Sequence, residues 1–133
     1  MITRGIRGAT TIKADTKENV LSATHELLDA IQAANPDLKL DDIASAIFST
    51  TEDVASAYPA LAARQMGWDL VPMMCAREIP VPGSLPLCIR VLIHWNTNKE
   101  QSAINHIYLR DAVKLRPDLV HVRKEEKPKE NYL

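Results

Sequence analysis

The chain has 133 residues, which fits one domain with its own hydrophobic core. Apolar residues make up 46% and charged residues 25%, and the net charge of −1 disfavours a dedicated nucleic-acid-binding protein, which normally has a basic excess. No apolar run is near the roughly 18 residues of a membrane span, and no export signal is visible, so we expect a cytoplasmic protein. Its two cysteines are then reduced thiols, too few for a disulfide framework, and we expect no metal site.

The beginning of the chain predicts a strand followed by a long helix. Residues 1–13 are rich in Ile and Thr, with three isoleucines on one face, which is typical of a strand. Gly5 and Gly8 inside it indicate a bulge or a close approach of another part of the chain. Asp15 is the predicted N-cap of an amphipathic helix that ends before Pro36.

The middle of the chain also alternates between predicted helices and predicted strands. A short helix is predicted after Asp41, and residues 46–51 read as a second strand. Pro59 suits the first turn of a further helix, and Gly67 suits its end. Residues 69–78 form an apolar run short enough for a buried strand.

The clearest strand pattern lies in residues 85–96. Its odd positions are all apolar, whereas its even positions are mixed and include Arg90 in mid-strand. Residues 104–109 and 112–115 predict two short strands.

This order of elements predicts an α+β domain in which a mixed sheet carries helices on one side. We expect the domain to span residues 1–119. Residues 120–133 are charged and contain proline, which predicts a mobile C-terminal tail.

The residues that suggest chemistry are arginines, since the sequence has no nucleophile elbow, no P-loop and no dinucleotide-binding fingerprint. Arg90 cannot lose its charge and is costly to bury unpaired. It is therefore an ion-pair partner, for example of Glu78, an exposed residue on a wet face, or a pocket residue for an anionic ligand. Arg7 has small neighbours that leave room for a ligand, although a surface position is the alternative. Arg116 alone indicates only a solvated side chain.

The other candidates have ordinary structural explanations. Tyr108 lies in an apolar strand and fits a core or rim position, and Cys75 fits a small buried apolar residue. Glu78 directly follows an arginine, and such a pair at a strand end is usually solvated. Residue types and spacing thus indicate a soluble α+β domain with the capacity to bind an anion.

Eight short blocks, taken in chain order, carry a family resemblance. They are RGIRGATT at 4–11, YPA at 58–60, GW at 67–68, VP at 71–72, CARE at 75–78, CIRV at 88–91, HIYL at 106–109 and AVKLRPDL at 112–119. Together they cover nearly the whole chain and resemble the small monofunctional chorismate mutases of the trimeric, barrel-like AroH class, as distinct from the all-helical class. Eight blocks in order, ending in Leu-Arg-Pro-Asp-Leu, make this resemblance specific.

The resemblance implies an enzyme that rearranges chorismate to prephenate, a step in phenylalanine and tyrosine biosynthesis, without a cofactor. In this Claisen rearrangement one carbon–oxygen bond breaks while a carbon–carbon bond forms. The protein must hold a flexible dianion in its reactive, chair-like shape and stabilise charge on the ether oxygen. The resemblance also implies a homotrimer, a pseudo-α/β-barrel with three sites between subunits, and no nucleic-acid or membrane partner.

Site roles follow from the same resemblance by matching motif. Arg90 would donate to the ether oxygen and a substrate carboxylate, and Arg7 would bind a carboxylate with help from the Tyr108 hydroxyl. Glu78 would accept the ring hydroxyl, with Cys75 beside it as a polar lining group. The residues that would complete the wall and mouth of the site are Tyr58, Ala60, Arg64, Met74, Leu115 and Arg116.

Three features depart from that pattern or leave alternatives. Strict alternation puts Cys75 and Glu78 on opposite faces of a strand, so bringing them together requires a bend or a strand end between them. Tyr58 stands where the family usually has Phe, and Leu61 stands where it often has Lys.

Two other functions are alternatives to the enzyme. The second hypothesis is a non-enzymatic protein of the same architecture that binds small carboxylates. The third is a nucleic-acid-binding protein, which the charge balance disfavours.

Overall fold

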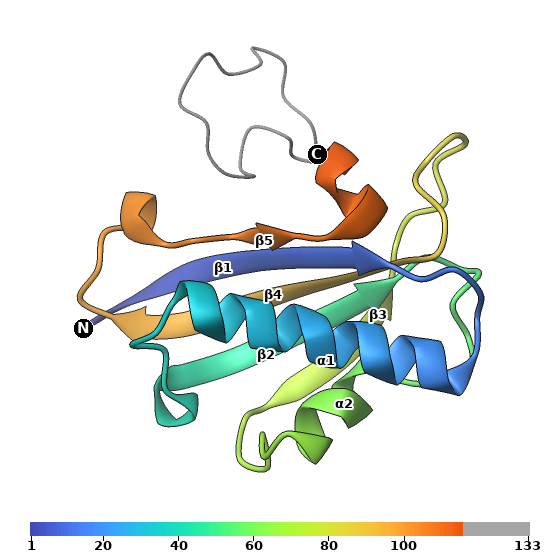
Figure 1. Ribbon diagram of the computed structural model, residues 1–133. Helices are drawn as coiled ribbons and strands as arrows, with labels where there is room; N and C mark the ends of the chain where they lie inside the picture. The colour runs from blue at the N-terminus through green and yellow to red at the C-terminus, as the bar shows by residue number, and fades with distance from the viewer. Residues whose placement is uncertain (116–133) are drawn as a thin grey trace.

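A computed structural model describes residues 1–115 of the chain, and it has one mixed sheet with helices on one face (Figure 1). The five strands lie in the order β3-β2-β4-β1-β5. The elements are β1 (Ile2–Thr11), α1 (Lys17–Ala34), η1 (Leu40–Asp42), β2 (Ile43–Thr50), α2 (Pro59–Gln65), β3 (Met73–Arg77), β4 (Cys88–Thr97), η2 (Gln101–Ala103), β5 (Ile107–Tyr108) and η3 (Arg110–Leu115), where η marks a 3-10 helix. The predicted α+β class and the placement of helices on one side are confirmed.

Strand β4 organises the sheet because it pairs antiparallel with both β1 and β2. The outer strands are parallel to their neighbours, β3 to β2 and β5 to β1. In this register Arg90 lies opposite Ala9 on one side and Ser49 on the other, and Ala9 also lies opposite Tyr108. Residues from four segments far apart in the sequence thus meet on one face.

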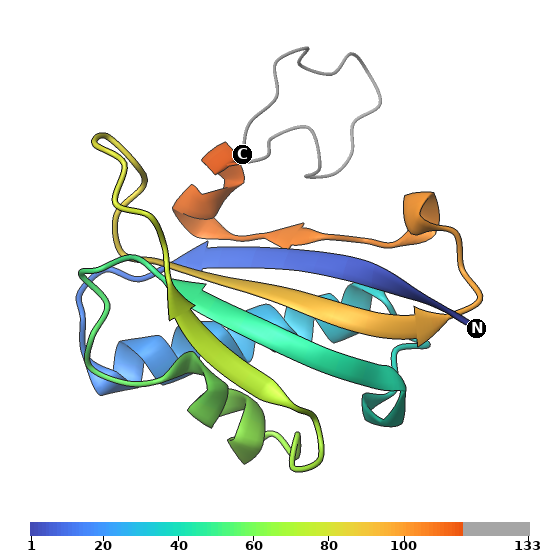
Figure 2. The same ribbon diagram turned by 180° about the vertical axis from the view of Figure 1, so that it is seen from behind.

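The opposite face of the sheet holds the main core. Ile6, Phe48 and Ile93 are fully buried there, packed with Leu27 and Ile31 of α1. This is the odd-numbered apolar face predicted for the β4 sequence. No α-helix within residues 1–115 covers the other face, as the view from behind shows (Figure 2).

Gly8 lets β1 approach α1 closely. A Cβ atom at this position would lie 2.8 Å from Ile31 Cδ1 and 3.2 Å from Val91 Cγ1. The close approach predicted for the glycines of this strand is therefore confirmed at Gly8. At Gly5 a Cβ atom would meet only Leu92 Cδ1, at an ordinary 3.7 Å.

The first helix is capped by a residue other than the predicted one. Thr16, not Asp15, is the N-cap, and its hydroxyl accepts a hydrogen bond from Asn19 N. The Asp15 carboxylate instead accepts hydrogen bonds from Ala55 N and from the backbone and hydroxyl of Ser56. These bonds hold the pKa of Asp15 below its ordinary value. Asp15 thereby anchors the β2–α2 loop to the start of α1.

Several predicted strands are shorter than their apolar runs. The strand predicted for 85–96 begins only at Cys88, because Leu87 adopts a left-handed φ of 51° and its N–H donates to the Asp53 carboxylate. The run 69–78 yields only β3, and Val71 is buried in the core outside any strand.

The region after β4 also departs from the prediction. Of the strand expected at 104–109, only β5 forms. The strand expected at 112–115 is wrong, since these residues belong to η3, where Ala112 N donates to Leu109 O in a 3-10 turn. Ala112 is fully buried in a small cluster with Ala9 and Tyr108, which holds this turn against the sheet.

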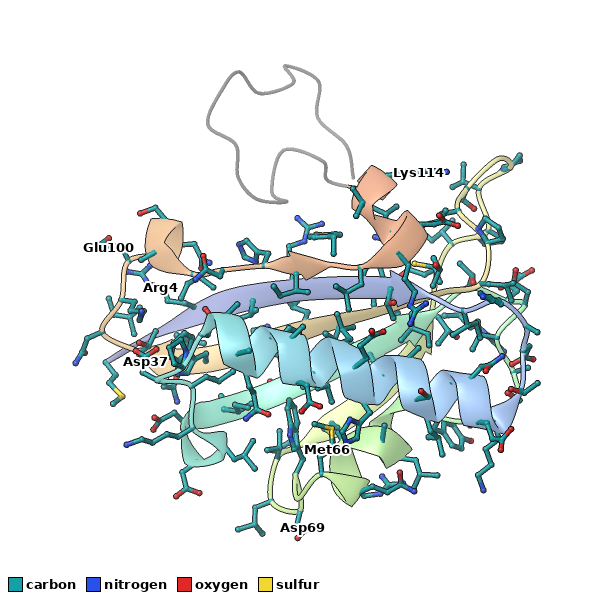
Figure 3. The ribbon with its side chains drawn as sticks, in the orientation of Figure 1. Arg4, Asp37, Met66, Asp69, Glu100 and Lys114 are labelled. Atoms are coloured by element: carbon teal, nitrogen blue, oxygen red, sulfur yellow. The ribbon has the colours of Figure 1, made fainter. Side chains whose placement is uncertain are left out.

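Ion pairs and apolar packing hold the loops and the end of α2 in place around the sheet (Figure 3). Near the N-terminus Arg4 pairs with Glu100 at 3.9 Å, and Lys99 pairs with Asp37 at 3.6 Å. Met66, at the end of α2, packs partly buried against the main core. None of the helices in residues 1–115 has the length and hydropathy needed to cross a bilayer.

Two predictions concern residues that the structure does not describe. Arg116, a predicted site residue, lies outside the described residues, and so does the tail predicted at 120–133. The boundary of the domain at residue 119 stays a prediction for the same reason.

Candidate active site

A cavity of about 460 Å³ lies on the face of the sheet opposite α1. Four of the residues predicted for the site come together in it. They are Arg7, Glu78, Arg90 and Tyr108. The rest of its lining consists of small and apolar residues and one serine: Gly8, Ala9, Ile47, Ser49, Val91 and Leu92. We call this the arginine cavity.

Arg90 and Glu78 form its electrostatic centre. Arg90 Nε lies 3.5 Å from Glu78 Oε2, and the two side chains are 31% and 26% exposed. Within the described residues Arg90 Nε is buried and makes no hydrogen bond. The ion pair with Glu78 that the sequence suggested therefore exists, but it lines an open cavity and leaves donor capacity on the guanidinium.

Glu78 is positioned just past the end of β3. Its backbone N–H donates to Thr50 O at 2.9 Å, which extends the pairing with β2 by one residue. Its carboxylate accepts a hydrogen bond from Ser49 Oγ. The Ser49 hydroxyl and the Arg90 guanidinium both contact the Glu78 carboxylate, and they hold it on the face of the sheet that bears the arginine cavity.

Arg7 is the cation of this cavity without an ion-pair partner in residues 1–115. It comes from the middle of β1, opposite Leu92, and its backbone N–H donates to His106 Nδ1 at 2.9 Å. Tyr108, from the adjacent β5, is 7% exposed and packs with Ala9. Two guanidinium groups against one carboxylate make the cavity net positive.

This chemistry suits an anion with more than one acceptor group. Guanidinium groups donate in a fixed fork that matches carboxylates and they stay charged at all ordinary pH values. Residues 1–115 contain no group of three His, Cys, Asp or Glu side chains placed to hold a metal ion. The arrangement can bind, orient and electrostatically stabilise an anionic ligand.

Within residues 1–115, the other predicted site residues do not line the arginine cavity. Cys75 and Tyr58 line a second cavity of about 540 Å³ between the β2–α2 loop and the start of α1, which we call the loop cavity. Side-chain alternation along β3 continues to Glu78, so Cys75 and Glu78 lie on opposite faces of the sheet. The expectation that Cys75 lies beside Glu78 is therefore not met within one chain.

Ala60, Arg64, Met74 and Leu115 line neither of these two cavities. Tyr58 is 71% exposed and Met74, beside Ile47 on the uncovered face of the sheet, is 62% exposed. Arg64 is exposed on α2, whereas Ala60 is buried in the core. Leu115 packs against the cluster that contains Tyr108.

Ser49 and Ile47 are two cavity residues that the sequence did not reveal. Both lie on β2 on the cavity side, and the only local signal is the alternation of this strand. The contact between Ser49 and Glu78 joins residues 29 positions apart, so it depends on the β2–β3 register.

The chain is similar to known proteins in both sequence and fold. A sequence model of the family "Chorismate mutase type I" matches residues 3–119. The chain is 54% identical over 116 residues to chorismate mutase AroH of Thermus thermophilus, which covers 87% of this chain and 95% of that protein. It is 43% identical over 120 residues to chorismate mutase AroH of Bacillus subtilis, covering 90% and 94%. A solved chorismate mutase from Clostridium thermocellum superposes with a TM-score of 0.81 at 47% identity, covering 84% of this chain and 98% of that one.

Proposed function

Because the chain belongs to the chorismate mutase type I family, we propose that it catalyses the rearrangement of chorismate to prephenate. The single observation that carries this proposal is the arginine cavity, in which Arg7, Glu78, Arg90 and Tyr108 converge from four strands or strand ends. A step within aromatic amino acid biosynthesis follows from this activity.

The reaction needs charge and shape, and not a nucleophile. The substrate is a dianion whose two reacting ends must be held close together, which a pair of fixed guanidinium groups achieves by binding its carboxylates. As the carbon–oxygen bond lengthens, negative charge grows on the ether oxygen while the carbon–carbon bond forms. A preorganised donor at that oxygen lowers the barrier because its interaction strengthens in the transition state.

In our proposal Arg90 is this donor, and it also binds a substrate carboxylate. Its unused donor capacity and its fixed place beside Glu78 support the role. Arg7, with the Tyr108 hydroxyl, binds the second carboxylate, and the lack of an ion-pair partner for Arg7 in residues 1–115 supports this. Glu78 accepts a hydrogen bond from the ring hydroxyl and keeps Arg90 in position.

We further propose that the complete site forms between copies of the chain in a homotrimer. The support is that the predicted residues divide between two separate cavities, with Tyr58 and Cys75 in the loop cavity. The uncovered face of the sheet also exposes Met74 and Leu92, which a second copy would bury. On this proposal Tyr58, Ala60, Arg64, Met74, Cys75, Leu115 and Arg116 supply the wall and mouth.

A cytoplasmic location is part of the proposal. It is supported by the two free thiols, Cys75 and Cys88, which are typical of a reducing compartment.

The activity is tested by following the fall in the ultraviolet absorbance of chorismate after adding purified protein, with prephenate identified as the product. Conversion at an enzymatic rate supports the proposal. Binding of chorismate by the folded protein without conversion would contradict it and favour a carboxylate-binding protein.

A further inference from the structure

The loop cavity carries positive charge that none of the roles above uses. Its lining includes Lys17, Arg77, Tyr58 and Leu61. Among residues 1–115 no acidic side chain lines it. A cavity lined by two cations, next to proposed site residues, attracts anions.

Arg77 has a structural task in this cavity. Its Nη1 donates to the backbone oxygens of Thr51 and Val54, both at 2.7 Å, and to Thr50 Oγ1 at 3.0 Å. The Asp15 carboxylate accepts hydrogen bonds from two N–H groups of the same loop, those of Ala55 and Ser56. Arg77 and Asp15 thus brace the β2–α2 loop from two sides.

Lys17 has no comparable structural explanation. It is exposed, and it forms no ion pair with any residue in the part of the chain that the structure describes. It is the first residue of α1, where the helix dipole opposes a positive side chain, so the stability of the helix does not account for it. Its position does place a free ammonium group at the loop cavity.

We propose that Lys17 attracts the dianionic substrate to the mouth of the active site. The inference rests on the proposed function, in which Tyr58 of the loop cavity forms part of the site. A cation that lines a cleft raises the local concentration and the association rate of an anionic substrate, and salt screens the effect. Lys17 therefore acts on KM and on kcat/KM, and not on kcat.

The test is steady-state kinetics of Lys17→Gln at low and high ionic strength, with Lys39→Gln as the matched control. Lys39 is also exposed, lies beyond the other end of α1, and loses the same charge. We expect KM for chorismate to rise on the order of three- to tenfold in Lys17→Gln at low salt, with kcat within about twofold of wild type. The difference should shrink as salt is added, and Lys39→Gln should behave like wild type.

A second variant tests whether Lys17 acts through its charge alone or through a specific contact with the substrate. In the double variant Lys17→Gln, Leu61→Lys the ammonium group moves from α1 to α2 within the lining of the same cavity, and KM should return towards the wild-type value. An unchanged KM in Lys17→Gln, a loss confined to kcat, or a double variant that stays impaired would each overturn the inference. These outcomes are distinct from failure of the proposed function, in which the wild-type protein itself would not convert chorismate.

Discussion

Arg90 and Glu78 form an ion pair that still leaves hydrogen-bond donors of the Arg90 guanidinium available to a ligand. Their separation of 3.5 Å and partial exposure mean that the pair gives little net stability, because water and salt screen it. The guanidinium is nevertheless fixed in place, since Ser49 and the end of β3 hold the carboxylate beside it. The pair is therefore better explained by positioning than by folding.

The first prediction concerns Arg90. Arg90→Ala should fold normally and lose at least on the order of 10²–10³-fold in kcat, because a preorganised donor is removed from the transition state. Arg90→Lys should also fail badly, since an ammonium group cannot reproduce the guanidinium fork. The measurement is chorismate turnover with thermal unfolding as the folding check.

Arg4→Ala is the matched control for this loss. Arg4 also lies on the sheet and pairs with a glutamate, but at the far end near the N-terminus and outside the arginine cavity (Figure 3). It should retain normal kcat. An Arg90→Ala variant with near-normal kcat would remove the role assigned to this residue.

The second prediction concerns the two thiols. Burial raises the pKa of Cys88 to about 11, so only on the order of a thousandth of this thiol is ionised at pH 8. Cys88 should therefore resist iodoacetamide in the native protein at pH 8 and react only after unfolding. Mass spectrometry of the alkylated peptides measures this, and the half-buried Cys75 provides an internal comparison. Native alkylation of Cys88 at the rate found in the unfolded chain would contradict the prediction.

At the scale of elements, the β-strand register does most to assemble the arginine cavity. Arg7 and Arg90 lie on neighbouring antiparallel strands, and β5 adds Tyr108 by pairing parallel to β1. On the opposite face of β1, the packing of α1 leaves no room for a side chain at Gly8. The strand that carries Arg7 on one face is therefore packed closely against α1 on the other.

The third prediction tests this contact. Gly8→Val should lower the free energy of unfolding by about 1–3 kcal/mol, because its side chain overpacks against Ile31 and Val91. Gly5→Ala is the control, since its Cβ atom meets Leu92 at an ordinary distance and should change stability little. Urea denaturation measures both variants. Equal stability of the two would show that α1 moves aside without cost.

At the scale of the whole molecule, the division of predicted residues between two cavities is the main structural argument for assembly. A site that takes the arginine cavity from one copy and the loop cavity from another would close over its ligand. A single chain leaves both cavities open and one sheet face uncovered (Figure 2). Exposed apolar residues on that face are typical of an interface.

The fourth prediction is that two inactive variants restore each other. Arg90→Ala removes one of the two cations of the arginine cavity, and Tyr58→Asp puts a repelling carboxylate in the loop cavity. Refolding an equal mixture should return about a quarter of wild-type activity, because random assembly pairs two intact cavities in that share of sites. The native mass should be three times the 14.8 kDa chain mass by light scattering.

Each variant refolded alone is the control and should stay inactive. If the mixture regains nothing while wild-type protein refolds with full activity, the site is contained within one chain and the shared-site proposal fails.

Much of the fold and part of the site were predictable from local patterns. The helical spacing in α1 and the apolar alternation in β4 depend on neighbouring residues, so they could be recognised without the structure. Arg90 could be singled out because a charge in mid-strand must have a partner. The ordered blocks indicated the family, and this is confirmed over residues 3–119.

Tertiary structure decided the features that depend on distant segments. Asp15 is drawn from the helix cap to the loop at Ala55 and Ser56, 40 and 41 residues away. Burial of Ala112 turned a predicted strand into a 3-10 turn, and the β2–β3 register brought the Ser49 hydroxyl to the Glu78 carboxylate, 29 residues away. The physical reason is the same in each case: local sequence sets the periodicity of a segment, whereas its hydrogen-bond and packing partners exist only once the sheet has formed.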